Sequence, residues 1–307
     1  MRRRKLRMLA RILAKKQALD SLRPLPPRLV EKLREQMQIE FTYNSNAIEG
    51  NTLSLRETQL VIREGITVRG RSLREHLEAR NHPDAIAYVE RLAQAGTAIS
   101  PDDVLRVHAI LLRGIDDEHD GQYRTGLVRV TGATFLPPPA QKIPALVREL
   151  LHTLAENPEE LSPIELAAMF HHRFVAIHPF LDGNGRTARL LTNVILTRHG
   201  YPFTTLLRVD RPVYLRALGE ADSGNLKPLV TFLAKCVERS LDIYLLAFDE
   251  DAGLLTLTEA SKLTPYSQEY LSLLARRGYL GAFKLRRNWV ITRAALTEYL
   301  QAHQSNA

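Results

Sequence analysis

The sequence predicts a mainly helical protein that ends in a small module of mixed helices and strands. Up to residue 248 the apolar residues recur mostly at helical spacing. Two segments there share a helix-start pattern, because Ser100 and Ser162 are each followed by a proline and, three residues on, by an acid. A capping hydroxyl, a proline at the first helical position and an acid in the first turn all favour a helix start.

Composition excludes several classes of protein. With 45% apolar and 25% charged residues, the chain is neither collagen-like nor wholly disordered. Its 307 residues allow two or three domains. A single cysteine, Cys236, forms no disulfide framework and is typical of a reducing compartment. We find neither a long apolar run nor a signal peptide in Met1–Gln17, so we expect a cytoplasmic protein without a membrane span.

The net charge of +8 is concentrated at the ends of the chain. Residues 1–16 carry eight basic side chains and no acid, so the remainder sums to zero. Residues 255–307 have a net charge of +4, which leaves residues 17–254 at −4. We expect the basic arm to be a solvated helix with an apolar stripe, and a contact with a polyanion or an acidic partner is the alternative.

Prolines and glycines separate the elements that follow the arm. Prolines between residues 24 and 27 precede a helix expected over residues 29–39. Residues 123–135 are the one strand or hairpin expected before residue 250, since β-branched residues lie there among glycines and three prolines follow. A further helix is expected over residues 166–177, and residues 249–253 form an acidic linker.

Beyond the linker, the pattern is that of a small winged helix-turn-helix. Helices are expected over residues 258–263, from Thr264 and Pro265 to Arg277, and from Thr292 to Leu300. Residues 283–285 and 289–291 are expected to form two short strands.

The segment from His178 to Arg189 carries the most specific chemical signal. It runs His-Pro-Phe-Leu-Asp-Gly-Asn-Gly-Arg-Thr-Ala-Arg and leads into an apolar helical pattern. A glycine-rich loop that opens into a helix offers unpaired N–H groups and a positive dipole end to a phosphate. Gly183 and Gly185 allow close approach, and the guanidinium groups of Arg186 and Arg189 lie three residues apart on one side. The loop lacks the ending of a Walker motif.

His178 and Asp182 add two further roles. A neutral histidine is suited to accept a proton near pH 7, and a carboxylate beside phosphates commonly anchors Mg²⁺. The set therefore favours phosphoryl or nucleotidyl transfer. A metal hydrolase built on His171, His172, His178 and Asp182 is the alternative, but the break at Pro179 argues against its rigid geometry.

This loop resembles the signature of the Fic family without a mismatch. Members of that family mostly transfer AMP from ATP to a hydroxyl side chain of a target protein. The resemblance covers residues 97–250, and Gly121–Arg124 with Phe135–Pro138 are similar to the family's flap, a short hairpin that pairs with an extended target segment. It implies a helical core with this hairpin, ATP and Mg²⁺ as cofactors, and a protein substrate with a Ser, Thr or Tyr hydroxyl, the chain itself included.

The resemblance also implies a role for each residue. His178 would deprotonate the target hydroxyl, and Asp182 would hold Mg²⁺. Nucleotide binding and catalysis would further involve Gly183, Asn184, Gly185, Arg186 and Arg189. Tyr214 and Asp222 lie where family members place residues that contact the base, although a core position is the alternative. The flap would dock the target through Val128, Val130 and Gly132.

A second signature lies upstream. Ser45–Thr52 resembles the inhibitory segment of Fic proteins that carry it N-terminal to the core. A helix laid beside the nucleotide pocket would let Glu49 pair with Arg189 and remove this arginine from the γ-phosphate. An ordinary helix end before Gly50 is the alternative. In some relatives the equivalent glutamate also positions water for removal of AMP, so deAMPylation is implied as well.

Residues 256–300 resemble the excisionase-type winged helix-turn-helix. Basic residues cluster at the end of its recognition helix and in its wing, where phosphate contacts would form: Arg276, Arg277, Lys284, Arg286 and Arg287. Pro265, Tyr266 and Gln268 depart from the usual helix start, and the wing turn lacks its glycine. DNA binding therefore stands beside a protein-docking or dimerising role, which would make the chain a homodimer.

Three parts are thus expected. Residues 1–96 hold the basic arm and helices with the inhibitory motif, residues 97–250 the Fic core, and residues 251–307 the winged helix-turn-helix module. Two functions remain open. The chain is either a self-inhibited protein AMP-transferase, or a DNA-binding transcriptional regulator whose Fic core senses nucleotide or modifies only itself.

Overall fold

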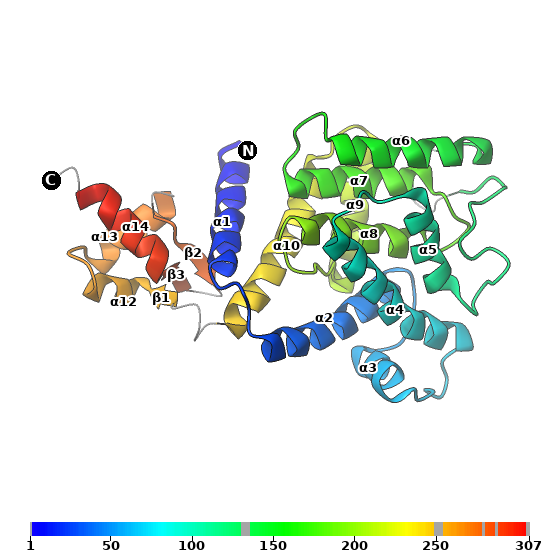
Figure 1. Ribbon diagram of the computed structural model, residues 1–307, viewed down its shortest axis with the longest axis horizontal. Coiled ribbons are helices and arrows are strands. Elements are labelled where there is room, and N and C mark those ends of the chain that lie inside the picture. The colour runs from blue at the N-terminus through cyan, green and yellow to red at the C-terminus, as the bar shows by residue number, and fades with distance from the viewer. Residues whose placement is uncertain (1, 130–135, 249–253, 278–279, 286–287, 305–307) are drawn as a thin grey trace. The chain divides into compact units, whose positions relative to one another are not determined.

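A computed structural model describes residues 2–129, 136–248, 254–277, 280–285 and 288–304 (Figure 1). The chain forms two compact units. One comprises Arg34–Cys236, and the other comprises Met1–Leu33 together with Val237–Ala307. Among the described helices, none is both long enough and apolar enough to cross a membrane.

The larger unit contains only helices and the loops between them in its described part. It contains the end of α2 (Pro27–Ile48) and the start of α10 (Lys227–Ala247). Between them lie α3 (Leu55–Glu64), α4 (Leu73–Ala95), α5 (Pro101–Leu112), η1 (Ala140–Lys142), α6 (Ile143–Glu156), α7 (Pro163–Ile177), α8 (Asn184–Arg198), η2 (Arg208–Asp210) and α9 (Arg211–Asp222). The expected mainly helical fold is confirmed.

Helix α8 forms the centre of this unit. Every residue from Arg186 to Leu196 is buried, and α8 packs against α4, α5 and α7. Figure 1 shows α8 alongside α7. A helix that is buried on all sides belongs to the core. The glycine-rich loop that begins α8 is therefore held on a rigid element.

Capping residues define the helix starts. Both expected capping boxes form, Ser100 with Asp103 at α5 and Ser162 with Glu165 at α7. Two further boxes begin α3 and α4, at Ser54 and Ser72. The helix expected over residues 29–39 extends to Ile48, so the first half of the predicted inhibitory segment forms the last turn of α2, and Glu49 directly follows the helix.

The expected flap hairpin is only partly visible. Residues 123–129, which include Val128, contain no strand. Val130 and Gly132 lie outside the described residues. The predicted hairpin therefore stays a prediction.

The smaller unit contains a three-stranded antiparallel sheet with the order β1-β3-β2. Its strands are β1 (Leu254–Thr256), β2 (Phe283–Leu285) and β3 (Asn288–Thr292), and Leu255 pairs with Ile291 across β1 and β3. Helices α12 (Leu257–Lys262), α13 (Gln268–Arg277) and α14 (Arg293–Gln304) accompany the sheet. The expected layout is confirmed, with β1 as an additional strand.

One helix start in this unit was predicted wrongly. Thr264 does not begin α13, because its hydroxyl donates to the Ala260 carbonyl and closes α12. Ser267 begins α13 instead, since its hydroxyl accepts the Tyr270 N–H at 3.3 Å. Both threonine and serine can cap either end of a short helix, so the sequence pattern alone left the boundary open.

The basic arm forms α1 (Arg2–Asp20), with Ile12 and Leu19 buried. Lys15 is buried as well, and its Nζ lies 2.6 Å from Glu238 and 2.5 Å from Asp242 of α10. The expected apolar stripe is therefore present. The acidic partner of this lysine belongs to the chain itself.

Candidate active site

The signature loop begins where α7 ends. His178 adopts a left-handed conformation with φ of 50°, and its N–H donates to the Phe174 carbonyl at 3.1 Å to close α7. A left-handed histidine is uncommon and needs support from its surroundings. Gly183, with φ of 76°, precedes the first residue of α8. Two left-handed residues thus fold the loop back between the two helices.

His178 has the protonation state of a base. Its Nδ1 lies 3.3 Å from the Val175 carbonyl, which assigns the proton to Nδ1 and leaves the lone pair on Nε2. Burial lowers the pKa of His178 below its usual value of 6.5, and the charge of Arg124 acts in the same direction. The imidazole is therefore neutral at pH 7.

Asn184 shapes the loop through its side chain. Its Oδ1 accepts the Phe180 N–H and its Nδ2 donates to the Phe180 carbonyl, both at 2.9 Å. The amide is thereby fully engaged within the loop. A contribution of Asn184 to anion binding would come from its backbone N–H at the start of α8.

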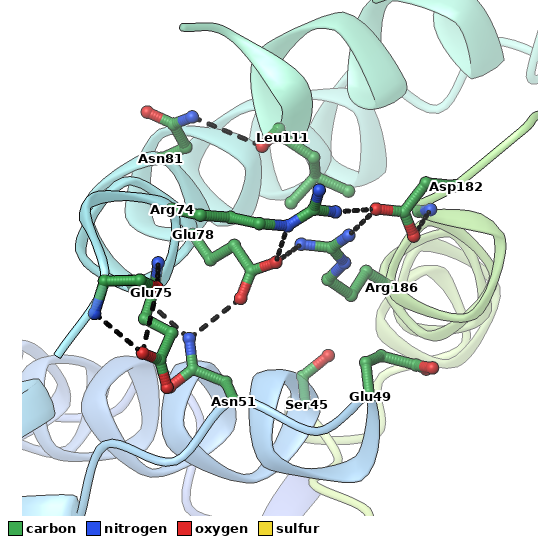
Figure 2. Close-up of polar contacts among 12 residues, drawn as sticks. Ser45, Glu49, Asn51, Arg74, Glu75, Glu78, Asn81, Leu111, Asp182 and Arg186 are labelled. Carbon is green, nitrogen blue, oxygen red and sulfur yellow. Dashed lines mark hydrogen bonds and ion pairs between the residues drawn. The ribbon is translucent and has the colours of Figure 1, made fainter. Parts of the chain in front are cut away.

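Asp182 lies among positive groups. Its Oδ2 accepts from Arg186 at 3.1 Å and from Arg74, and its Oδ1 accepts the Gly183 N–H at 2.6 Å (Figure 2). Burial alone would raise the pKa of Asp182, but the Arg186 charge and the Gly183 N–H outweigh it and hold the pKa below 3.8. Asp182 is therefore an ionised carboxylate at neutral pH.

This carboxylate fits a magnesium site that includes phosphate. Within the described part of the chain, no three histidine, cysteine or acidic side chains gather into a site made by protein alone. Mg²⁺ in nucleotide sites is commonly held by one or two carboxylates together with phosphate oxygens. Asp182 is a carboxylate that could serve in this way, on a side chain that is 44% exposed.

Arg189 is paired with Glu49. The Arg189 side chain is 1% exposed, and its Nη2 lies 2.7 Å from Glu49 Oε1. The same guanidinium donates to the Ser45 hydroxyl at 2.9 Å and to the Ser45 carbonyl at 2.8 Å. A Cβ on residue 185 would overlap Glu49 Oε1, so Gly185 is required for this approach. The structure therefore brings the upstream segment onto the signature loop.

Comparisons with known proteins identify the family of the chain. The sequence pattern of the Fic/DOC family matches residues 98–196, and that of a helix-turn-helix domain matches residues 254–304. The solved structure of residues 134–508 of Fic-1 from Caenorhabditis elegans is 31% identical, covers 80% of this chain and 73% of its own, and has a TM-score of 0.72. The chain belongs to the Fic/DOC family.

Two further relatives show the extent of the Fic likeness. A Fic-domain signaling protein from Bacteroides thetaiotaomicron is 29% identical, covers 78% of this chain and 97% of its own, and has a TM-score of 0.72. The protein adenylyltransferase Fic of Nematostella vectensis is 36% identical over 240 residues, which are 78% of this chain and 56% of the relative. The chain spans about half the length of the curated relatives it matches.

The two residues expected near the base lie on α9 and contact α7. Tyr214 is buried, and its Oη lies 2.7 Å from Nε2 of His171, whose Nδ1 contacts Thr192. Asp222 accepts from His172 at 2.9 Å. Burial raises the pKa of Tyr214 to about 12. The polar ends of both residues thus hold two helices of the Fic core together. The hydrolase alternative requires a cluster of metal-binding side chains, and none forms among the described residues, where both ring nitrogens of His171 contact Thr192 and Tyr214.

Two residues that support the Fic loop were not assigned a role from the sequence. Arg124 is 3% exposed and donates to the carbonyls of His178, Gly126 and Pro138, at 2.6 to 2.8 Å. His108 stacks on Phe180 at 3.6 Å, and its Nε2 lies 3.0 Å from the Asp182 carbonyl. Arg124 lies in the segment that resembles the flap, but its contact with His178 could not be read from that pattern, and no local pattern marks His108. Both contacts with the loop join residues that are distant in sequence.

Proposed function

We propose that this Fic protein is a self-inhibited protein adenylyltransferase, which transfers AMP from ATP to a hydroxyl side chain of a target protein. The observation that carries the proposal is the Glu49–Arg189 ion pair, 2.7 Å long, beside a signature loop with all its chemical groups in place. The names of the curated relatives, which are protein adenylyltransferases, support the reaction type.

The reaction assigns one task to each group. Nε2 of His178 takes the proton of the target hydroxyl, whose oxygen attacks the α-phosphorus. The bond from this phosphorus to the oxygen bridging to the β-phosphate breaks, and pyrophosphate leaves. The first N–H groups of α8 stabilise the charge on the phosphates. Asp182 would hold Mg²⁺, which would supply positive charge to neutralise the phosphates.

Self-inhibition follows from the position of Glu49. Its carboxylate lies against Gly185 in the first turn of α8, where a phosphate would bind, and it engages the Arg189 guanidinium. Two contacts hold this end of α2 in place. Arg211 donates to the Ile48 carbonyl at 2.8 Å, and Asn44 accepts the Arg208 N–H at 2.9 Å. Productive ATP binding therefore requires Glu49 to leave.

The test is AMP transfer from radiolabelled ATP at saturating ATP and Mg²⁺. Glu49→Gly and Glu49→Gln should each raise labelling about ten- to a hundredfold, the worth of a charge-assisted pair. Glu35→Gln is the matched control, because Glu35 lies on the same helix in an exposed pair with Arg63. Glu49 variants no faster than wild type would show that the segment is only a helix end.

The helix-turn-helix match favours a second activity, and we infer that residues 254–304 bind duplex DNA. Arg276 near the end of α13 is exposed, whereas Arg286 and Arg287 lie outside the described residues. Arg276→Gln should weaken binding of the full chain to mixed-sequence DNA and lower the salt slope by about one. Lys32→Gln, an exposed lysine outside the module, is the control. A chain that shows no salt-dependent DNA binding would instead favour protein docking or dimerisation.

A further inference from the structure

Four charged side chains close into a ring beside the signature loop. Arg74 and Glu78 lie one turn apart on α4 and face Asp182 and Arg186 (Figure 2). Arg186 lies 3.1 Å from both Asp182 and Glu78. Arg74 contacts Asp182 through Nη2, and its Nε lies 3.3 Å from Glu78. Positive and negative charges thus alternate around the ring, which is neutral as a whole.

The Arg74–Asp182 contact of the ring can separate more easily than the contacts of Arg186. The Arg186 side chain is 2% exposed, and its partner Glu78 is also fixed by Asn51, which donates at 2.8 Å. The Arg74 side chain is 55% exposed. Separating Arg74 from Asp182 therefore strands no buried charge, because Asp182 keeps Arg186 and the Gly183 N–H while Arg74 keeps Glu78.

Helix stability does not explain an arginine at residue 74. The N-cap of α4 is Ser72, so Arg74 lies in the first turn, next to the positive end of the helix dipole. An acid is favoured at such a position and a cation is disfavoured. Glu75, which completes the capping box, shows the usual choice. The favourable contacts of Arg74 are those with Asp182 and Glu78.

We propose that Arg74 controls access of divalent cations to Asp182. Its guanidinium contacts Oδ2 of Asp182 and must release this oxygen before a cation can bind there, while its contact with Glu78 remains. The inference rests on the proposed function, and it adds a contact that is independent of Glu49. Glu49 withholds Arg189 from the phosphates, whereas Arg74 withholds the carboxylate from the metal.

The test measures metal uptake directly. Mn²⁺ binding is followed by electron paramagnetic resonance in the full-length Glu49→Gly chain, saturated with a non-hydrolysable ATP analogue. Adding Arg74→Gln should tighten Mn²⁺ binding about two- to fivefold, the range expected for an exposed ion pair. Adding Arg74→Lys, which keeps the charge, should leave it near the parent value. Arg113→Gln is the matched control, because Arg113 is 57% exposed and pairs with Asp84 away from the loop.

Each outcome decides between distinct conclusions. Tighter Mn²⁺ binding by Arg74→Gln alone supports the proposal, and a matching fall in the Mg²⁺ concentration for half-maximal labelling strengthens it. Binding unchanged by Arg74→Gln overturns it. Weaker binding overturns it too and would make Arg74 a phosphate ligand. If no variant takes up Mn²⁺, Asp182 is not a metal anchor and the inference fails, while the labelling assay still tests AMP transfer separately.

Discussion

Arg186 and Arg189 lie about one turn apart on α8 and are 2% and 1% exposed, yet their surroundings differ. Arg186 is compensated by two carboxylates, Glu78 of α4 and Asp182 of the loop. Arg189 has one carboxylate within ion-pair distance among the described residues, that of Glu49, whose side chain is 39% exposed. One buried charge is thus held from two sides and the other from a single segment.

This difference separates a fixed charge from an exchangeable one. A buried cation requires an anion, because an unpaired charge in the protein interior is costly. For Arg186 two residues of the core supply it. For Arg189 the anion is either Glu49 or, under the proposed function, a phosphate of ATP. The predictions below test this contrast, from the largest expected effect to the smallest.

The largest loss of AMP transfer should come from a change at His178, which sets the scale for the changes at Arg186 and Arg189. His178→Ala should reduce AMP transfer by about a hundredfold to ten-thousandfold, the range for loss of a general base, while ATP binding measured by calorimetry is retained. His152→Ala, an exposed histidine of α6, is the control. Labelling within threefold of wild type would rule out His178 as the base.

Arg186→Met should cost more stability than Arg189→Met. Without Arg186, the carboxylates of Glu78 and Asp182 share one cationic partner, Arg74. Glu78 is 11% exposed, and breaking a buried ion pair such as Arg186–Glu78 costs about 3 to 5 kcal/mol. Loss of Arg189 affects one carboxylate that can reach solvent. Urea unfolding of both variants measures the difference, and equal losses would contradict the contrast.

Arg189→Ala should cancel the effect of removing Glu49. Under the proposed function, the roughly ten- to hundredfold gain of Glu49→Gly depends on a free Arg189. The double variant should therefore label no better than Arg189→Ala alone, which makes the two changes strongly non-additive. A double variant as active as Glu49→Gly would show that Arg189 is dispensable for the outer phosphates.

Acid should lower the free energy of unfolding through His171, a buried histidine of α7 whose pKa is affected by the charge of Arg189. Burial lowers the pKa of His171 from 6.5 to about 3, and the charge of Arg189 adds to the effect. Between pH 6.5 and 3, His171 is therefore protonated in the unfolded chain but not in the folded chain, so the free energy of unfolding falls as the pH falls through this range. The loss from this one group is about 2 kcal/mol at pH 5. His171→Gln should flatten the pH dependence of urea unfolding, whereas His152→Gln, on an exposed histidine, should not.

Local patterns in the sequence predicted much of the architecture. The helix starts at Ser100 and Ser162 were predicted correctly, because a capping box involves residues only three positions apart. The start of α13 was predicted wrongly where Thr264 and Ser267 compete for capping. Strand β1 was missed, since three residues carry too little periodicity and pair only with β3.

In the candidate site, too, local patterns were predicted and most contacts between distant segments were not. The segment from His178 to Arg189 was identified from the sequence because its residue types are contiguous and their spacing is specific. The sequence could place Tyr214 and Asp222 on one helix, but the contacts of their polar ends with His171 and His172 depend on how α9 packs on α7. The contacts of Arg124 and His108 with the loop were missed for the same reason, although Arg124 lies in the segment that resembles the flap.

By itself, the sequence determined the family signature, the helical class and the position of the glycine-rich turn, because each depends on interactions within a few residues along the chain. Only the tertiary structure decided which charges meet. Arg74 reaches Asp182 across 108 positions in the sequence, a contact that no pattern indicated, whereas the pair of Glu49 with Arg189 was expected from the upstream signature. Such pairs form only where packing brings distant segments within about 4 Å, since the attraction between two charges weakens with distance and with exposure to water.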